Sequence, residues 1–402
     1  GKLTLTSANT FDDTLTINSG VVNAQNATAL GTTAAGTVVA NNAALELQGG
    51  VTVGAETLSL AGTGVSSGGA LRNISDNNTY QGAITQTAAS RINSDSGILT
   101  LSSATAISGS GYNLTFGGAG DITISSPIGT GAGTVTKDGA GTLKLTGTST
   151  YSGTTTVSDG TLIMNGTNTS SAVTVSASKV LTGSGSVGGL TLSGTLYPGS
   201  ASNSIDRLAV TSLTMNNGSK AVFQLGNCLD TANRDFISNS GSATINATTT
   251  ITVDDDALSN FDNTASYSWN LIVGGISSAA NFALDTNTVW GTNCGGGTFA
   301  LSASGNNLAL TFTPLPTTPE IALADNGTQV AAANVAAGTA NRVLHKSQLS
   351  VTVAAATLTG VSFTSAGTYT ATDISNFKVW FATDSTLDTG SDTLLGTIST
   401  GL

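Results

Sequence analysis

GAGTLKLTGTSTYSGTTTVSDGTL, residues 139–162, alternates apolar and small polar residues in short runs that glycine-rich turns separate. Leu143 and Leu145 lie two positions apart, and Val157 and Leu162 flank a Ser-Asp-Gly turn. A period of two is typical of β-strands with one apolar face, whereas an amphipathic helix repeats every ~3.6 residues. The stretch therefore predicts short strands joined by tight turns.

The same pattern recurs along the chain. Residues 1–22 align with residues 141–162 without a gap, and partial copies occur at 78–85 and 97–102. The aligned positions carry similar side chains: Leu3 and Leu143, Leu5 and Leu145, Phe11 and Tyr151, Gly20 and Gly160. A repeated strand–turn–strand unit is typical of a solenoid, in which each unit buries its apolar face against the next.

Short alternating strands fit two architectures, an antiparallel sandwich and a parallel β-helix. The repeat favours the β-helix, because copies of one unit stack in register, leucine on leucine inside and glycine at corners that need positive φ. We therefore predict a parallel β-helix over residues 1–312. Residues 243–312 are expected to form its cap, since the strands lengthen there and Trp269 and Trp290 occur.

A boundary follows the predicted β-helix. Three of the five prolines lie within residues 313–319, which predicts a stiff, extended linker. Residues 320–402 contain longer alternating strands, for example 349–353 and 377–381. This spacing predicts an immunoglobulin- or fibronectin-like β-sandwich, so the whole chain is expected to be all-β.

Composition excludes several classes of function. Only 9% of the 402 residues are charged, with 12 Lys and Arg against 23 Asp and Glu and a net charge of −11. Nucleic-acid binding needs clustered cations, so we predict no nucleic-acid partner. No apolar run reaches the ~18 residues of a transmembrane helix, so no membrane-spanning segment is predicted in this chain.

Residues 139–162 closely resemble the passenger-associated repeat of bacterial autotransporter adhesins, as do residues 71–85 and 91–101. Residues 194–208 are similar to the segment that usually follows those repeats. The resemblance implies a right-handed parallel β-helix, a cell-surface or secreted location, a secretion machinery as partner during export, and a role as stalk or adhesin.

The C-terminal module carries a second resemblance. Residues 356–363 and 372–380 are similar to modules of very large surface adhesins of gliding bacteria. This resemblance implies export by type IX secretion.

A chemical site is hard to find in the sequence. His345 is the only histidine, which excludes Ser-His-Asp, Cys-His and multi-histidine metal sites within this chain. We therefore predict that the protein is not an enzyme and needs no cofactor. One acidic group could bind Ca²⁺, which prefers six to eight oxygen ligands, although such a run is also typical of a solvated loop: Asp254, Asp255, Asp256 and Asp262.

Cys228 and Cys294 are the only cysteines. In an exported protein they could form a disulfide, and two unrelated buried thiols are the alternative.

Our leading hypothesis is a non-enzymatic surface stalk whose hydroxyl-rich exterior adheres to host, glycan or other surfaces. The alternatives are a carbohydrate-active β-helix enzyme, such as a polysaccharide lyase or hydrolase, and a subunit of an extracellular filament. The positions of the carboxylates distinguish the surface stalk from the carbohydrate-active enzyme. An enzyme needs its carboxylates together in a groove, whereas a stalk leaves them dispersed.

Overall fold

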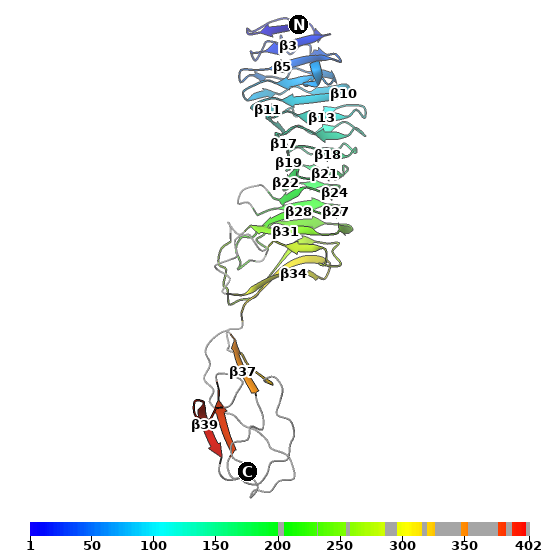
Figure 1. Ribbon diagram of the computed structural model, residues 1–402. Coiled ribbons are helices and arrows are strands. Elements are labelled where there is room, and N and C mark those ends of the chain that lie inside the picture. Colours follow the sequence, from blue (N-terminus) through cyan, green and yellow to red (C-terminus); the bar gives the residue numbers. More distant parts are fainter. Residues whose placement is uncertain are drawn as a thin grey trace. The chain divides into compact units, whose positions relative to one another are not determined.

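Short parallel strands, stacked coil upon coil, build the N-terminal part of the molecule (Figure 1). The computed structural model describes residues 1–199, 205–230, 232–254, 258–285, 296–315, 320–325, 347–352, 377–382 and 388–398. The chain divides into two units, residues 1–314 and residues 315–402. Apart from the 3-10 turn η1 (Val65–Ser67), every regular element described is a β-strand.

Sheet A, the largest, has 17 strands in two parallel columns that share the 11-residue strand β10. The shorter column is β2 (Leu15–Ile17), β4 (Thr37–Val39), β7 (Leu58–Gly62), β10 (Ile84–Ser94), β12 (Ile107–Ser108) and β15 (Ile128–Gly129). The longer column is β1 (Lys2–Leu5), β3 (Gly20–Ala24), β5 (Ala43–Leu47), β8 (Leu71–Asn73), β10, β13 (Leu114–Gly117), β16 (Val135–Lys137), β18 (Thr155–Val157), β21 (Val173–Val175), β24 (Gly189–Leu192), β27 (Ser212–Asn216) and β30 (Ala243–Asn246).

Two further sheets complete the coils. Sheet B is wholly parallel and contains β6 (Thr52–Val53), β9 (Asn78–Tyr80), β11 (Ile98–Leu101), β14 (Asp121–Ile124), β17 (Thr142–Leu145), β19 (Thr161–Met164), β22 (Val180–Gly183), β25 (Thr195–Pro198), β28 (Lys220–Gln224), β31 (Thr249–Asp254) and β33 (Phe282–Leu284). Sheet C contains β20 (Thr167–Asn168), β23 (Ser186–Val187), β26 (Arg207–Val210), β29 (Phe236–Asn239), β32 (Tyr267–Val273), β35 (Asn307–Thr313) and β34 (Thr298–Ser304).

The core is the lumen that the three sheets enclose. Successive strands of the longer column of sheet A place one inward residue each in the same register: Leu3, Val22, Leu45, Leu71, Ile92, Phe116, Lys137, Val157, Val175, Leu192, Met215 and Ile245. Leucine, isoleucine and valine dominate because they fill a pleated interior without leaving polar atoms unpaired. This stack confirms the predicted parallel β-helix.

Corner glycines allow the coils to approach closely. Gly160 has a φ of +65°, and a Cβ there would meet the carbonyl oxygens of Gly139 and Gly141 at 2.4 Å. Gly20, its counterpart in the first repeat copy, has a φ of +75° and a similar contact to Gly1. Both positions exclude larger residues, as the repeat pattern predicts.

Two details differ from the prediction. Leu3 is 55% exposed, because β1 lies at the edge of sheet A and no described strand covers its far side. The aligned copies also lie on different sheets, since β1 belongs to sheet A and β17 to sheet B. Coils differ in length, so the same motif falls on different faces of the β-helix.

The end of the first unit changes from parallel to antiparallel pairing. β35 pairs antiparallel with both β32 and β34. An aromatic cluster lies on this sheet, where Phe261 contacts rings of the strands themselves, and its members are Phe261, Tyr267, Trp269, Phe299 and Phe312. Trp290 lies outside the described residues.

The second unit has antiparallel pairing, as predicted. β36 (Glu320–Asp325) pairs with β37 (Ser347–Thr352), and β38 (Phe377–Phe381) pairs with β39 (Thr393–Ile398).

Candidate functional site

The acidic group proposed for Ca²⁺ is only partly described. Asp254 ends β31, whereas Asp255 and Asp256 lie outside the described residues. Asp262 accepts hydrogen bonds from the backbone N–H of Thr264 at 2.9 Å and from its hydroxyl at 2.7 Å, and these bonds lower the pKa of Asp262. In the described part of the chain, no three His, Cys, Asp or Glu side chains are grouped to hold a metal. The calcium site stays a prediction.

Cys228 is buried and forms no disulfide with a described residue. Burial raises the pKa of its thiol to about 11, so the reactive thiolate is disfavoured. Cys294 and His345 lie outside the described residues, so the disulfide stays a prediction.

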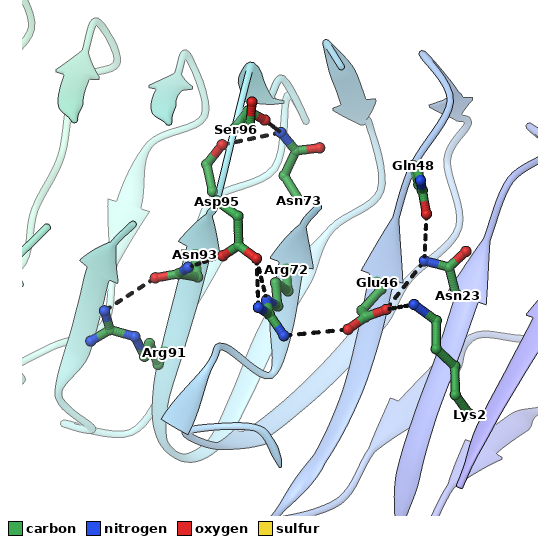
Figure 2. A network of polar contacts seen from close by, with 11 residues as sticks. Lys2, Asn23, Glu46, Gln48, Arg72, Asn73, Arg91, Asn93, Asp95 and Ser96 are labelled. Carbon is green, nitrogen blue, oxygen red and sulfur yellow. Dashed lines mark hydrogen bonds and ion pairs between the residues drawn. The ribbon is translucent and has the colours of Figure 1, made fainter. Parts of the chain in front are cut away.

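A ladder of ion pairs crosses the outer face of sheet A (Figure 2). Glu46 pairs with Lys2 at 2.6 Å and with Arg72 at 3.5 Å, and Arg72 pairs with Asp95 at 2.5 Å. The amides of Asn23 and Asn93 donate to these carboxylates at 3.2 and 2.7 Å. Charges of opposite sign therefore alternate along the ladder, and the neutral Asn23 on β3 lies between the coils of Lys2 on β1 and Glu46 on β5.

The ladder continues one step further. Arg91 donates to the Asn93 side chain at 3.1 Å and pairs with Asp138, beyond β16, at 2.6 Å. Each cation has a carboxylate partner, so this surface offers no surplus charge to a ligand.

One inward position of sheet A carries a charged residue. Lys137 is 2% exposed and stands where the other members of its column are apolar. Its Nζ donates to the carbonyl oxygens of Gly139 and, at 3.3 Å, Asp159, and burial lowers the pKa of this amine. Lys137 thereby ties the corner after β16 to the corner of the next coil.

The aromatic position of the repeat is hydrogen-bonded in one copy. Tyr151 is buried, and its hydroxyl lies 2.7 Å from Oγ1 of Thr155, which lies 2.9 Å from Oγ of Ser171.

The corresponding tyrosine of the partial copy, Tyr80, has Ile84 in place of the threonine. Among the described residues, its buried hydroxyl has no hydrogen-bond partner, nor does Oε2 of Glu56. Glu56 is 4% exposed, and its Oε1 accepts a bond from the hydroxyl of Thr37 at 3.0 Å. Burial raises the pKa of Tyr80, with a further contribution from the charge of Glu56. This copy therefore holds unsatisfied polar atoms inside the lumen.

Among the described carboxyl groups, Asp235 has the pKa that is shifted furthest from its ordinary value. It is 5% exposed, and its two oxygens accept bonds from the backbone N–H groups of Asp206 at 2.9 Å and Gln224 at 3.1 Å. Burial raises the pKa of Asp235 to about 7, and the charges of Asp206 and Asp254 act in the same direction. Asp235 therefore links its own segment to those of Asp206 and Gln224, and each carboxyl oxygen accepts one of the two hydrogen bonds.

Seven outward threonines form one column across sheet A, the threonine ladder. Each is the in-register partner of the next, with no register shift: Thr115, Thr136, Thr156, Thr174, Thr191, Thr214 and Thr244. All are at least partly exposed to solvent.

Sequence reasoning did not find the ion-pair ladder, Lys137 or Asp235. Their partners are remote in sequence and are brought together only by the coil register. The threonine ladder had a partial signal, because a Val-Thr-Val triplet at 173–175 and a Leu-Thr-Leu triplet at 190–192 mark two of its strands.

Comparison with known proteins bears on this architecture. Residues 1–24 and 135–164 match the family model described as passenger-associated-transport-repeat. Two segments of the chain are therefore similar to this passenger-associated repeat. The second match includes Lys137 and the Tyr151–Thr155 pair, whereas residues 71–85 and 91–101, which also resemble the repeat, lie outside the matches.

No curated protein sequence matches the chain. Among the described residues, no helix is long and apolar enough to cross a membrane.

Proposed function

We propose that this chain is a segment of a non-enzymatic adhesin, exposed at the bacterial surface or secreted, in which the β-helix is a stiff, extended scaffold. One observation carries the proposal: the longer column of sheet A runs unbroken through twelve parallel strands and includes strands of both passenger-repeat matches. A close-packed lumen transmits load with little deformation, which suits a stalk that presents a contact surface away from a cell.

The carboxylates support a scaffold over a carbohydrate-active enzyme. A glycosidase needs two carboxyl groups about 5–9 Å apart beside a substrate. Among described residues, Glu46, Asp95 and Asp138 are in ion pairs, and Asp235 is buried with both oxygens bonded to backbone. These groups stabilise coils instead of converging on an open groove.

Export belongs to the same proposal. The passenger repeats support transport out of the cell, and the resemblance of the C-terminal module to gliding adhesins favours type IX secretion. The partners are then the secretion machinery and a host, glycan or other surface.

Labelling of intact cells tests location and route together. An antibody against residues 1–314 is applied to intact and permeabilised cells, in strains with and without a working type IX system. We expect labelling of intact cells, or capture from medium, that is lost without type IX secretion. Labelling only after permeabilisation contradicts the surface location.

The purified chain tests the enzymatic alternative. It is incubated with a panel of acidic and neutral polysaccharides, and new reducing ends and unsaturated uronates are measured. We expect binding to a surface or glycan without turnover. Sustained release of oligosaccharides would establish the carbohydrate-active alternative instead.

A further inference from the structure

Two buried glutamates in the same part of the β-helix have very different partners. Glu46 and Glu56 are both 4% exposed. Glu46 lies on the outer face of sheet A and pairs there with Lys2 and Arg72 (Figure 2). The amide of Asn23 also donates to this carboxylate. Two cations and an amide donor stabilise the charged form of Glu46.

Glu56 lies just before β7 and has one described donor. The hydroxyl of Thr37, in β4, donates to Oε1 at 3.0 Å, whereas Oε2 is buried and has no hydrogen-bond partner among the described residues. In the described part of the chain, no lysine or arginine forms an ion pair with Glu56. A carboxylate at this position would be buried without compensation, whereas a neutral carboxylic acid is far less costly to bury.

The strands around Glu56 supply no charge that would compensate it. β2, β4, β6, β7 and β9 contain no Asp, Glu, Lys, Arg or His, and their one titratable side chain is Tyr80 of β9. The hydroxyl of Tyr80 is buried and also has no described partner. β10 carries Arg91, whose guanidinium lies on the outer face and pairs with Asp138. These groups therefore leave an ionised Glu56 without a counter-charge.

Glu56 is held between two neighbouring coils. In the coil before it, the backbone N–H of Thr37 donates to the carbonyl oxygen of Thr57 at 2.8 Å. In the coil after it, Gly82 packs so closely that a Cβ there would lie 1.5 Å from the carbonyl oxygen of Glu56. An ionised carboxyl can therefore regain water only when the contacts to one of these coils open.

We propose that Glu56, with Thr37 and Gly82 on either side, is a pH-sensitive lock between these coils. The coils stay closed while the carboxyl carries a proton, and they open locally over residues 37–82 when the proton is lost. Each coil of a solenoid contacts only its neighbours, so a local opening leaves remote coils folded. The lock concerns the internal stability of the β-helix and does not depend on the proposed function.

The direction of the pH effect follows from the same burial. Burial raises the pKa of Glu56 above its ordinary value of 4.5, and the hydrogen bond from Thr37 opposes this change. The closed coils therefore keep a proton that the opened coils release. The stability that Glu56 contributes is complete below pH 4.5 and is lost as the pH rises through the raised pKa. The limiting change in the opening equilibrium is about tenfold per pH unit.

Hydrogen exchange of the full chain, followed by mass spectrometry from about pH 5 to about pH 9, tests the lock. Exchange rates are corrected for the intrinsic pH dependence of amide exchange, so that protection factors are compared. Peptides from residues 37–82 report on the lock, and peptides from residues 173–192 are the reference within the same molecule. The test variant is Glu56→Gln, which mimics the neutral acid. Its matched control is Glu46→Gln, which removes a carboxyl of equal exposure that has cation partners.

We expect the protection of residues 37–82 in the wild type to fall by at least ~10-fold over this range, whereas Glu56→Gln keeps its protection. Glu46→Gln should lower protection by a similar factor at every pH and keep the wild-type pH profile. Residues 173–192 should be equally protected in the wild type and in Glu56→Gln. The lock is overturned if these two proteins share one pH profile over residues 37–82, or if residues 173–192 lose protection to the same extent.

Melting curves show whether each variant is folded. If Glu56→Gln is unfolded, Glu56→Met replaces it, because an apolar side chain of similar length also removes the titrating proton. If neither variant folds at any pH, neutral groups cannot replace the carboxyl, and that result also overturns the lock.

Discussion

The hydroxyl of Tyr151 and that of Thr155 lie 2.7 Å apart inside the β-helix, and the partial repeat at Tyr80 lacks this pair because Ile84 replaces the threonine. The two tyrosines are buried to the same degree, so one position offers a satisfied phenol and the other an unsatisfied one.

Replacing each tyrosine by phenylalanine should therefore have different effects. Tyr151→Phe removes a made hydrogen bond and should lower the free energy of unfolding by about 1 kcal/mol. Tyr80→Phe removes a hydroxyl without a partner, so it should be neutral or stabilising. Urea denaturation followed by circular dichroism measures both. Equal losses in the two variants would show that the Thr155 bond does not stabilise the fold.

Two glycines in neighbouring coils test how closely the coils pack. A Cβ at Gly82 would lie 1.5 Å from the carbonyl oxygen of Glu56, whereas a Cβ at Gly54 meets nothing within 4 Å. We expect Gly82→Ala to cost about 1–3 kcal/mol or more through overpacking. Gly54→Ala should stay within about 1 kcal/mol of wild type. Similar melting temperatures for the two variants would contradict this register.

Lys137 should matter for stability although it is charged and lies in an apolar column. Lys137→Ala removes the two corner hydrogen bonds and leaves a cavity, so we expect a loss of about 2–4 kcal/mol. Lys144, on the outer face of sheet B, is the matched control, and Lys144→Ala should change stability by less than about 0.5 kcal/mol. Thermal unfolding distinguishes them. If Lys137→Ala leaves the stability unchanged, the two corners do not depend on the hydrogen bonds of the amine.

Asp235 should give stability a defined pH dependence. Its pKa is about 7 in the fold against an ordinary value of 3.8, so between these values the fold keeps a proton that the unfolded chain has released. Its contribution is complete below pH 3.8 and falls as the pH rises to about 7, with a limiting slope of about 1.4 kcal/mol per pH unit.

Asp235→Asn cannot titrate, so the unfolding free energy of wild type minus that of the variant should fall by the same amount as the pH rises across this interval. Urea titrations at pH 4, 5, 6 and 7 measure that difference. A difference that does not vary with pH would show that Asp235 is ionised throughout.

Features that depend on the local residue pattern could be predicted from the sequence, whereas contacts that depend on the register between coils could not. The period of two and the Ser-Asp-Gly turn predicted strands and turns, because these depend on neighbours in sequence. The parallel stack was predicted from the repeat, because copies of one unit stack in register. Leu143 and Leu145 are buried as expected, at 0% and 4% exposure.

Partners across coils could not be predicted. Arg91 meets Asp138 and Asp235 meets Gln224 because coils of unequal length happen to align them. A shift of one residue in any coil would move each side chain to the opposite face, and no local rule fixes that phase.

The parallel register of sheet A is the central claim, and cross-linking between two adjacent strands tests it most directly. Asn216 of β27 is the partner of Asn246 of β30. Parallel neighbours lie about 4.8 Å apart, within the ~4.4–6.8 Å that a disulfide spans. In a chain carrying Cys228→Ser and Cys294→Ser, the pair Asn216→Cys and Asn246→Cys should form a disulfide under mild oxidation. The pair Asn216→Cys and Ser242→Cys, four positions out of register, should not. An antiparallel hairpin would give the reverse result, and that outcome would contradict the β-helix.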